Sequence, residues 1–318
     1  FWLKLLSSSV VRSRHKFQFL MSPFGSFVAS ALALGVTALR FEEIAVNHEE
    51  GHQHRLQHEP KCTLGDIENE VLSTTDIFMR SYHGDLEWLD HSVPSITESM
   101  QCRLGVLRDV LVIVPEDDVP AFNEKLDAVW SKEMFPARLR HRWQVMPSRV
   151  KVVGDGYQEQ MLDKLHSDLY SNADHFIYLD TDTVLVRDLT REQLFDDVGQ
   201  PYLCHRSVAK CGKDCEMWMQ EHVKPMVGEG EMLEHEFMCL GEAFPRYLFA
   251  HVRFVVEEHK GAEWHNFTVD ARASGASPWA EPGSAVGFTE FNTMGAVMWR
   301  DFHERAHWLD TFTSDLDM

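Results

Sequence analysis

The segment His175–Val184 limits the possible folds more than any other part of this chain. It reads His-Phe-Ile-Tyr-Leu-Asp-Thr-Asp-Thr-Val, an apolar run that leads directly into two carboxylates, Asp180 and Asp182. A short apolar run is typical of a strand that is buried on both faces of a sheet. Residues i and i+2 of an extended chain point to the same side. We therefore expect both carboxylates at the carboxyl end of a central strand, where open α/β sheets bind ligands.

Two neighbouring carboxylates repel each other unless a cation lies between them. Hard oxygen ligands suit Mg²⁺ or Mn²⁺, whose coordination is completed by waters and substrate phosphates. The alternative, a strand that simply ends in a polar turn, stays open on this motif alone.

The chain before this segment alternates between strand and helix patterns. Apolar runs predict strands at 76–81 and 110–114 and a weaker one at 151–153. Apolar residues recur at helical spacing over 85–100 and 157–169, and a further helix is predicted at 120–130. This alternation predicts an α/β fold with a mostly parallel sheet and helices on both faces.

The pattern is less regular in the C-terminal half. An edge strand is expected at 201–204 and helices at 215–227 and 244–260, and the apolar segment 287–299 contains a single acid, Glu290. No clean linker interrupts this part of the sequence, so residues 73–318 are expected to form one domain.

The N-terminal residues have the composition of a membrane anchor. Residues 1–20 are basic and contain no acid, and residues 21–39 carry no charge. A helix of this length nearly spans a bilayer core of about 30 Å, and the preceding basic residues favour a cytosolic N-terminus. We expect a cytosolic tail (1–20), a transmembrane anchor (21–39), a polar stem (40–72) and a luminal domain in the Golgi or another secretory-pathway membrane. A cleaved signal peptide and a buried core helix remain alternatives.

Charge and cysteine content narrow the function classes further. The net charge is -20, which argues against nucleic acid as a partner because phosphate backbones need a basic surface. Six cysteines are present, and the Cys211-x-x-x-Cys215 spacing fits a local disulfide or two free thiols better than a zinc site. The triplet Asn266-Phe267-Thr268 is a glycosylation sequon.

Two kinds of chemistry use an apolar strand followed by Asp-x-Asp. In phosphohydrolases of the haloacid dehalogenase type, the first Asp is a nucleophile, but the motif opens its domain. In nucleotide-sugar transferases of the GT-A type the motif lies in mid-domain and holds a divalent cation on the diphosphate. The position of Asp180 and Asp182, after about 100 residues of predicted strands and helices, favours the second kind.

Several stretches together resemble a GT-A-like family of largely uncharacterised nucleotide-sugar transferases. They occur in the family's order across roughly residues 75–310. The stretches are an opening strand and helix, a segment before the metal motif, the motif itself and a late acidic segment, at 76–82, 85–89, 156–165, 179–183 and 287–295.

The resemblance implies roles for individual residues. Arg80 and Asp85 would line the nucleotide end, and Gln160 and Lys164 would face the donor from one helix face. Lys164 would balance the diphosphate charge. For Gln160 and Lys164, a solvated helix face remains the alternative.

Two later residues complete the predicted site. Glu290 would orient or deprotonate an acceptor hydroxyl, or else be a buried acid paired with an arginine. His235 would be a third metal ligand beside Asp180 and Asp182, although His265, His303 and His307 are also available.

These observations predict a metal-dependent glycosyltransferase. It would use Mn²⁺ or Mg²⁺ and a nucleotide-sugar donor, with a glycan, protein or lipid as acceptor. A phosphohydrolase with Asp180 as nucleophile and a non-catalytic nucleotide-sugar-binding protein remain as alternatives.

Overall fold

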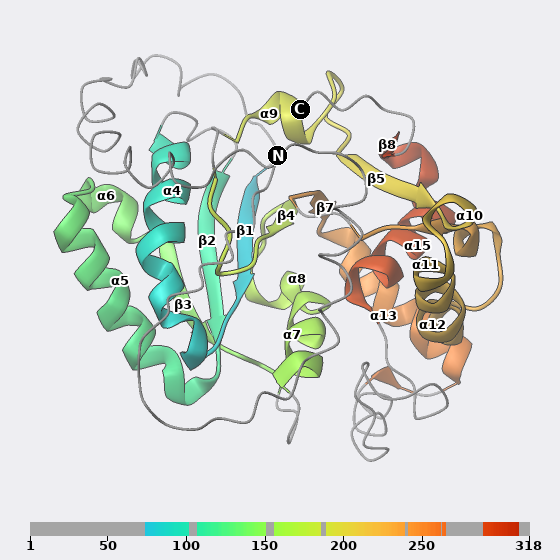
Figure 1. The fold of residues 1–318 in the computed structure, drawn as a ribbon, viewed down its shortest axis with the longest axis horizontal. Helices are drawn as coiled ribbons and strands as arrows, with labels where there is room; N and C mark the ends of the chain where they lie inside the picture. The colour runs from blue at the N-terminus through green and yellow to red at the C-terminus, as the bar shows by residue number, and fades with distance from the viewer. Residues whose placement is uncertain are drawn as a thin grey trace, which may run out of the picture. The chain divides into compact units, whose positions relative to one another are not determined.

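A five-stranded sheet forms the centre of the computed structural model, which describes residues 74–101, 107–150, 156–185, 189–238, 241–261, 263–264 and 289–311 (Figure 1). The strand order is β3-β2-β1-β4-β7. β1 pairs in parallel with β2 and β4, β2 pairs in parallel with β3, and β7 is antiparallel to β4. The strands are β1 (Thr75–Arg80), β2 (Leu107–Val114), β3 (Trp143–Pro147), β4 (His175–Tyr178) and β7 (Ala243–Pro245).

Alternate residues of the central strands enter two separate hydrophobic cores. Ile77 and Met79 of β1 face one core, which also contains apolar residues of α4 (Leu89–Gln101) and α5 (Val119–Glu133). Phe78 faces the other, which contains residues of α7, α8, α13 and α15. These four helices span Gly156–Lys164, Ser167–Tyr170, Tyr247–Lys260 and Glu290–Phe302. The predicted α/β class, a mostly parallel sheet flanked by helices, is confirmed.

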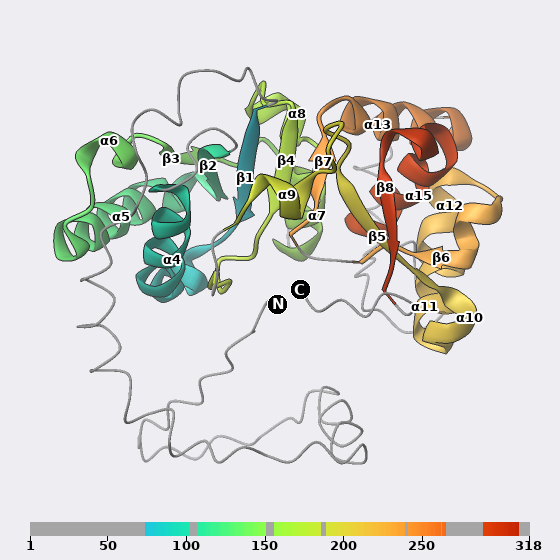
Figure 2. The ribbon, with the colours of Figure 1, turned by 90° about the horizontal axis from the view of Figure 1, so that it is seen from above.

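A second, three-stranded sheet lies in the C-terminal half, beside α10 (Val208–Cys211), α11 (Lys213–Met217) and α12 (Lys224–Val227) (Figure 2). Its order is β6 (His235–Glu236), β5 (Tyr202–Ser207) and β8 (His307–Asp310). The expectation of an edge strand at 201–204 is therefore wrong, because β5 is the middle strand and pairs on both sides. The partners come from segments far along the chain, so the local pattern could not reveal them.

The remaining described elements are short. The expected helix at 215–227 is continuous but contains a π-helical turn, Trp218–Val223, between α11 and α12. The others are α6 (Ala137–Arg140), α9 (Arg191–Leu194), α10 (Val208–Cys211), α11 (Lys213–Met217), α12 (Lys224–Val227) and 3₁₀ turns at His83–Trp88, Glu116–Asp118, Glu231–Glu234 and His303–Arg305.

Both edge strands of the large sheet contain a proline. Pro147 ends β3 and Pro245 ends β7, and the edge strands of a sheet are where proline is tolerated. The sequence pattern missed β3 because its buried Trp143 is followed by a polar and two half-exposed residues. The strand expected at 151–153 lies outside the described residues. The expected helix at 244–260 begins instead at Tyr247, because the residues before it pair with β4.

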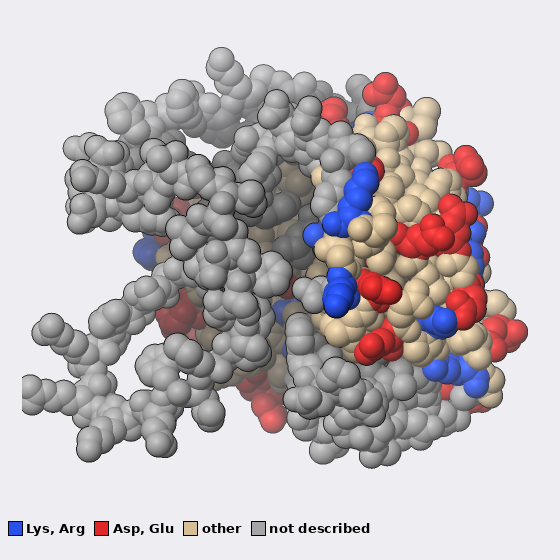
Figure 3. All heavy atoms as spheres, turned by 45° about the vertical axis from the view of Figure 1, so that its right-hand side comes forward, with Lys and Arg blue, Asp and Glu red and all other residues tan. Residues whose placement is uncertain are grey.

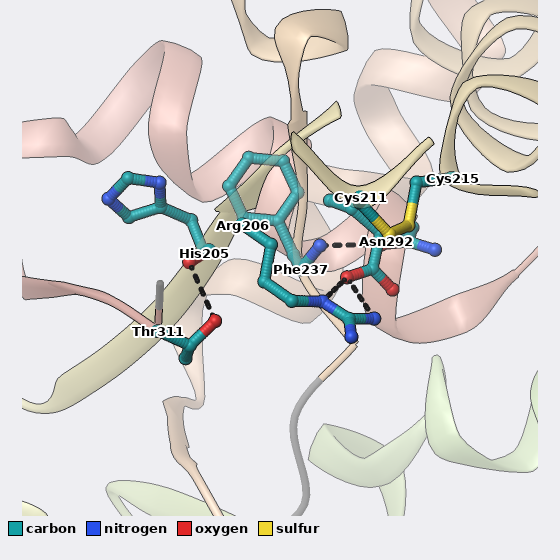
Figure 4. Close-up of a disulfide and its surroundings, with 8 residues drawn as sticks. His205, Arg206, Cys211, Cys215, Phe237, Asn292 and Thr311 are labelled. Carbon is teal, nitrogen blue, oxygen red and sulfur yellow. Dashed lines mark hydrogen bonds and ion pairs between the residues drawn. A yellow bond between two sulfur atoms is a disulfide. The ribbon is translucent and has the colours of Figure 1, made fainter. Parts of the chain in front are cut away.

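The spacing of Cys211 and Cys215 was expected to give either a local disulfide or two free thiols. Cys211, the last residue of α10, and Cys215 of α11 form a disulfide (Figure 4). The alternative of two free thiols is thereby excluded.

The expected localisation is corrected. In the ranges that the structure describes, no helix combines the length and the apolar composition needed to cross a bilayer. The assignment to a single-pass protein of the Golgi or another secretory-pathway membrane is therefore withdrawn, and with it the membrane as a partner. The tail (1–20), anchor (21–39), stem (40–72) and sequon lie outside the described residues. The boundary of the domain at residue 73 stays a prediction.

Candidate functional site

The order of the strands defines one special position in the large sheet. From β1 the chain proceeds outward to β2 and β3, then returns to place β4 on the other side of β1. The carboxyl ends of β1 and β4 therefore meet at a topological switch point, where open α/β sheets form a ligand-binding crevice. Arg80 ends β1, and the amide of Leu179 donates to the carbonyl of Phe78 at 3.2 Å.

A cavity of about 500 Å³ opens at this switch point. Seven of the eight predicted site residues line it, contributed by β1, the following 3₁₀ turn, α7, the segment after β4 and α15. The lining residues are Arg80, Asp85, Gln160, Lys164, Asp180, Thr181, Asp182, Met238, Thr289, Glu290 and Phe291.

Asp180 and Asp182 reach the cavity from a turn rather than from the strand itself. β4 ends at Tyr178, and the amide of Thr183 donates to the carbonyl of Asp180 at 2.9 Å. Asp180 and Asp182 therefore do not continue an extended strand, as the sequence pattern had predicted, although both carboxylates line the same cavity. Thr181 between them is buried.

Asp85 brings a third carboxylate to this side of the cavity. Burial raises its pKa above the usual value, and the nearby charges of Asp182 and Asp180 raise it further, while a hydrogen bond from the Ser81 hydroxyl opposes the shift. Three acids thus share a partly desolvated space. A cation there would relieve their mutual repulsion.

Arg80 is engaged in a buried network below the cavity. Its Nε donates to Asp163 Oδ2 at 2.7 Å, and its guanidinium lies 3.2 Å from Glu159 Oε2. Asp163 is fully buried and also accepts from the hydroxyls of Ser148 and Tyr170. The network fixes α7 against the carboxyl end of β1, and so fixes the positions from which Gln160 and Lys164 extend.

The sequence reasoning assigned no role to Asp163. A signal was present, because Asp163 lies three residues after Gln160 and so on the same face of the helix.

Lys164 and Glu290 form a buried ion pair inside the cavity. Lys164 Nζ lies 2.9 Å from Glu290 Oε1 and 4.6 Å from the centre of the Phe291 ring. Each of the two residues is 5% exposed. Glu290 is therefore a buried acid with a basic partner. The alternative role considered for it was a buried acid paired with an arginine, but its partner is Lys164, which is itself a predicted site residue.

A second cavity, of about 460 Å³, adjoins the first. Both share Arg80, Asp85 and Gln160 as lining residues. The second is also lined by Ser81, Tyr82, His83, Pro115, Asp118 and Glu159.

Tyr82 presents an aromatic face in the second cavity. Its side chain is 57% exposed, and a Cβ atom added to Gly84 would lie 2.6 Å from its ring. Only glycine at position 84 therefore leaves space for this ring position. The backbone amide of His83 donates to Asp118 Oδ2 at 2.8 Å, which ties the turn to the segment after β2.

His235 does not line either cavity. Its Nδ1 lies 3.2 Å from His205 Nδ1 on the neighbouring strand β5, and its ring lies 4.2 Å from that of Trp299. Burial lowers the pKa of His235. The structure therefore does not bring His235 together with the two aspartates. His303 and His307 lie near the second sheet, and His265 is outside the described residues.

The donor set at the switch point fits a hard divalent cation with an open coordination sphere. Within the described ranges, no group of three or more His, Cys, Asp or Glu side chains is arranged to hold a metal ion. Asp180 and Asp182 would supply two oxygen ligands, and Mg²⁺ is usually bound in this way, by one or two carboxylates together with waters and substrate phosphates.

Comparisons with known proteins show only distant structural similarity. No protein-family model and no curated protein matches the sequence. Among solved structures, the galactosyltransferase LgtC, in complex with donor and acceptor sugar analogs, is similar over 70% of each chain, with 13% identity and a TM-score of 0.40.

Two further structures are less similar. Mannosyl-3-phosphoglycerate synthase from Rubrobacter xylanophilus matches 55% of each chain, with 13% identity and a TM-score of 0.28. 4-Diphosphocytidyl-2C-methyl-D-erythritol synthase from Anaerococcus prevotii DSM 20548 covers 75% of this chain and 87% of its own, with 10% identity and a TM-score of 0.33. At these scores none of the three supports an argument about activity.

Proposed function

We propose that this chain is a glycosyltransferase that moves a sugar from a nucleoside diphosphate to an acceptor hydroxyl with the help of Mn²⁺ or Mg²⁺. The observation that carries the proposal is the convergence of Asp180, Asp182, Lys164 and Glu290 on one cavity at the switch point of the sheet. The two aspartates supply oxygen ligands for a metal ion. Lys164 supplies a positive charge for phosphate, and Glu290 supplies a carboxylate that can accept a hydroxyl proton.

The side chains divide the chemistry among them. Asp180 and Asp182 would hold the divalent ion, which supplies charge neutralisation on the leaving diphosphate. Lys164 donates hydrogen bonds to phosphate oxygens, and Gln160, one turn earlier on α7, orients the donor. Glu290 accepts the proton of the acceptor hydroxyl.

The second cavity is the proposed site for the nucleoside. Tyr82 offers an exposed ring on which a base can stack, a contact worth about 1–3 kcal/mol for each base. Because Arg80, Asp85 and Gln160 line both cavities, a nucleoside there would direct its phosphates toward Asp180 and Asp182.

The proposal is tested by calorimetric titration of the chain with UDP and GDP, with and without Mn²⁺. We expect one of the nucleotides to bind only when Mn²⁺ is present. Asp182→Ala should weaken this binding by at least about tenfold, equivalent to about 1.4 kcal/mol. Asp127→Ala, which removes an exposed partner of Arg140, is the matched control and should bind like the wild type.

Failure of both nucleotides to bind with Mn²⁺ would refute the proposal. Equal affinity for Asp182→Ala and wild type would show that the carboxylate pair holds no ion. Trapping of an aspartyl phosphate on Asp180 after incubation with a phosphomonoester would support the phosphohydrolase instead.

A further inference from the structure

The ion pair between Lys164 and Glu290 connects two parts of the proposed site that have opposite tasks. Lys164 is the last residue of α7, on the donor side, and Glu290 is the first residue of α15. Their charged atoms lie 2.9 Å apart, and both side chains are almost completely buried. In this state the ammonium group neutralises the carboxylate. The pair therefore occupies both the Glu290 oxygen that an acceptor hydroxyl would need and the ammonium group that a phosphate would need.

The Lys164 ammonium can leave Glu290, giving up the ion pair and its contact with the Phe291 ring, while its backbone stays in place. The backbone of Lys164 is fixed, since its carbonyl accepts from Ser167 Oγ at 2.7 Å and from Tyr178 Oη at 3.1 Å. Its four-carbon side chain is flexible, so the ammonium can move while α7 stays in place. The same cavity contains the turn of Asp180 and Asp182, where a diphosphate would be held.

Glu290 remains stabilised after such a separation. It occupies the first turn of α15, where unpaired backbone amides and the helix dipole favour a negative charge. The carboxylate therefore keeps a favourable electrostatic environment at the start of α15 when the ammonium group leaves.

We propose that the donor diphosphate draws Lys164 away from Glu290, and that this exchange frees Glu290 to accept the acceptor proton. The inference rests on the proposed function. In the reaction the acceptor O–H bond breaks and its proton goes to Glu290. The acceptor oxygen bonds to the anomeric carbon, and the bond from that carbon to the diphosphate breaks with its electron pair on the leaving nucleoside diphosphate. The exchange makes donor binding a precondition for activation of the acceptor.

A double-mutant cycle on nucleotide affinity tests the exchange. Titrations use the full chain with Mn²⁺ and whichever of UDP or GDP the wild type binds. Glu290→Gln should tighten binding about tenfold, because the diphosphate no longer competes with a carboxylate for Lys164. Lys164→Met should weaken binding, and adding Glu290→Gln to Lys164→Met should then give no gain.

Measuring the effect of Glu290→Gln in the Lys164→Met protein as well as in the wild type distinguishes the exchange from simple charge repulsion. If Glu290→Gln improves affinity equally with and without Lys164, the removed negative charge acts on the nucleotide directly and the exchange is refuted. Unchanged affinity in Glu290→Gln would refute it as well. In both cases nucleotide binding by the wild type keeps the proposed function intact, whereas no binding by the wild type overturns both proposals.

A milder variant covers the outcome that Glu290→Gln does not fold, which circular dichroism would reveal. Glu290→Asp keeps the charge but shortens the side chain, so it weakens the ion pair without removing the carboxylate. It should give a smaller gain in affinity that again disappears in the Lys164→Met background. A gain that persists there, or no gain, would contradict the exchange.

Discussion

Single residues in this protein show how burial changes the behaviour of a charged or titratable group. His175, the first residue of β4, is 9% exposed, and its ring packs 4.8 Å from that of Phe195. Its Nδ1 has no hydrogen-bond partner among the described residues. Burial lowers the pKa of His175 to about 4, and the nearby charge of Asp174 opposes this shift. The histidine is therefore neutral in the folded protein at neutral pH.

This pKa predicts a loss of stability in mild acid. The unfolded chain binds a proton at His175 below a pH of about 6.5, while the folded protein does not until about pH 4, so acid favours unfolding between these values. Between pH 7 and pH 5 the wild type should lose about 2 kcal/mol more than His175→Gln, in which position 175 does not titrate. Urea denaturation at both pH values measures this. Parallel losses in the two proteins would contradict the assigned pKa.

Helix α15 shows how one element joins the two sheets. Its first residues line the first cavity. The side chain of Asn292 accepts a hydrogen bond of 2.7 Å from the backbone amide of Phe237, which follows β6 (Figure 4). One turn later, Gly295 lies directly against Phe237. A Cβ atom at position 295 would be 2.2 Å from Phe237 Cβ. The absence of a side chain therefore allows the helix and the segment after β6 to approach closely.

Gly295→Ala is expected to destabilise the protein, although alanine favours helices over glycine by about 1 kcal/mol. The clash is with a Cβ atom fixed to the backbone, so overpacking should cost about 1–3 kcal/mol net. Urea denaturation gives the change in unfolding free energy. The control is Glu258→Ala on the exposed side of α13, which should change stability by less than about 0.5 kcal/mol. A more stable Gly295→Ala would show that the helix can shift.

At the level of the whole molecule, the excess of negative charge affects how any nucleotide approaches. The net charge is -20, and in the coloured part of the face drawn in Figure 3 acidic side chains are spread over the surface, with basic side chains between them. A nucleoside diphosphate is itself an anion, so its approach is opposed over long distances. The attraction that retains it must act at short range, at the cation and Lys164.

This charge predicts an unusual salt dependence. Raising ionic strength from 0.01 to 0.15 M shortens the screening length from about 30 to about 8 Å. Association of the nucleotide at saturating Mn²⁺ should then become roughly two- to threefold faster. Association of Mn²⁺ alone should become slower, which provides an internal control. Stopped-flow measurements give both rates, and slower nucleotide association at high salt would mean that a local positive field dominates.

Much of the fold, and the positions of Asp180 and Asp182, followed from local patterns, whereas the other candidate site residues followed from the family resemblance. The apolar runs predicted β1, β2 and β4, and seven proposed site residues line one cavity. The strand that was missed, β3, and the strand that was taken for an edge strand, β5, could not be recognised from local patterns for related reasons. β3 is half-exposed and lacks an apolar run, and β5 is a middle strand only because β6 and β8 pair with it.

The sequence alone determined which side chains follow which strands, because hydrophobic periodicity is a local property and parallel strands end at a common edge. It could not determine which of those side chains contact one another. Lys164 and Glu290 are separated by 126 positions, and only packing of α15 against the large sheet's helices brings them to 2.9 Å. The pairing of β6 with β5 placed His235 beside His205 instead of beside the aspartates. Such contacts depend on the tertiary fold, since they join segments whose local patterns are independent of each other.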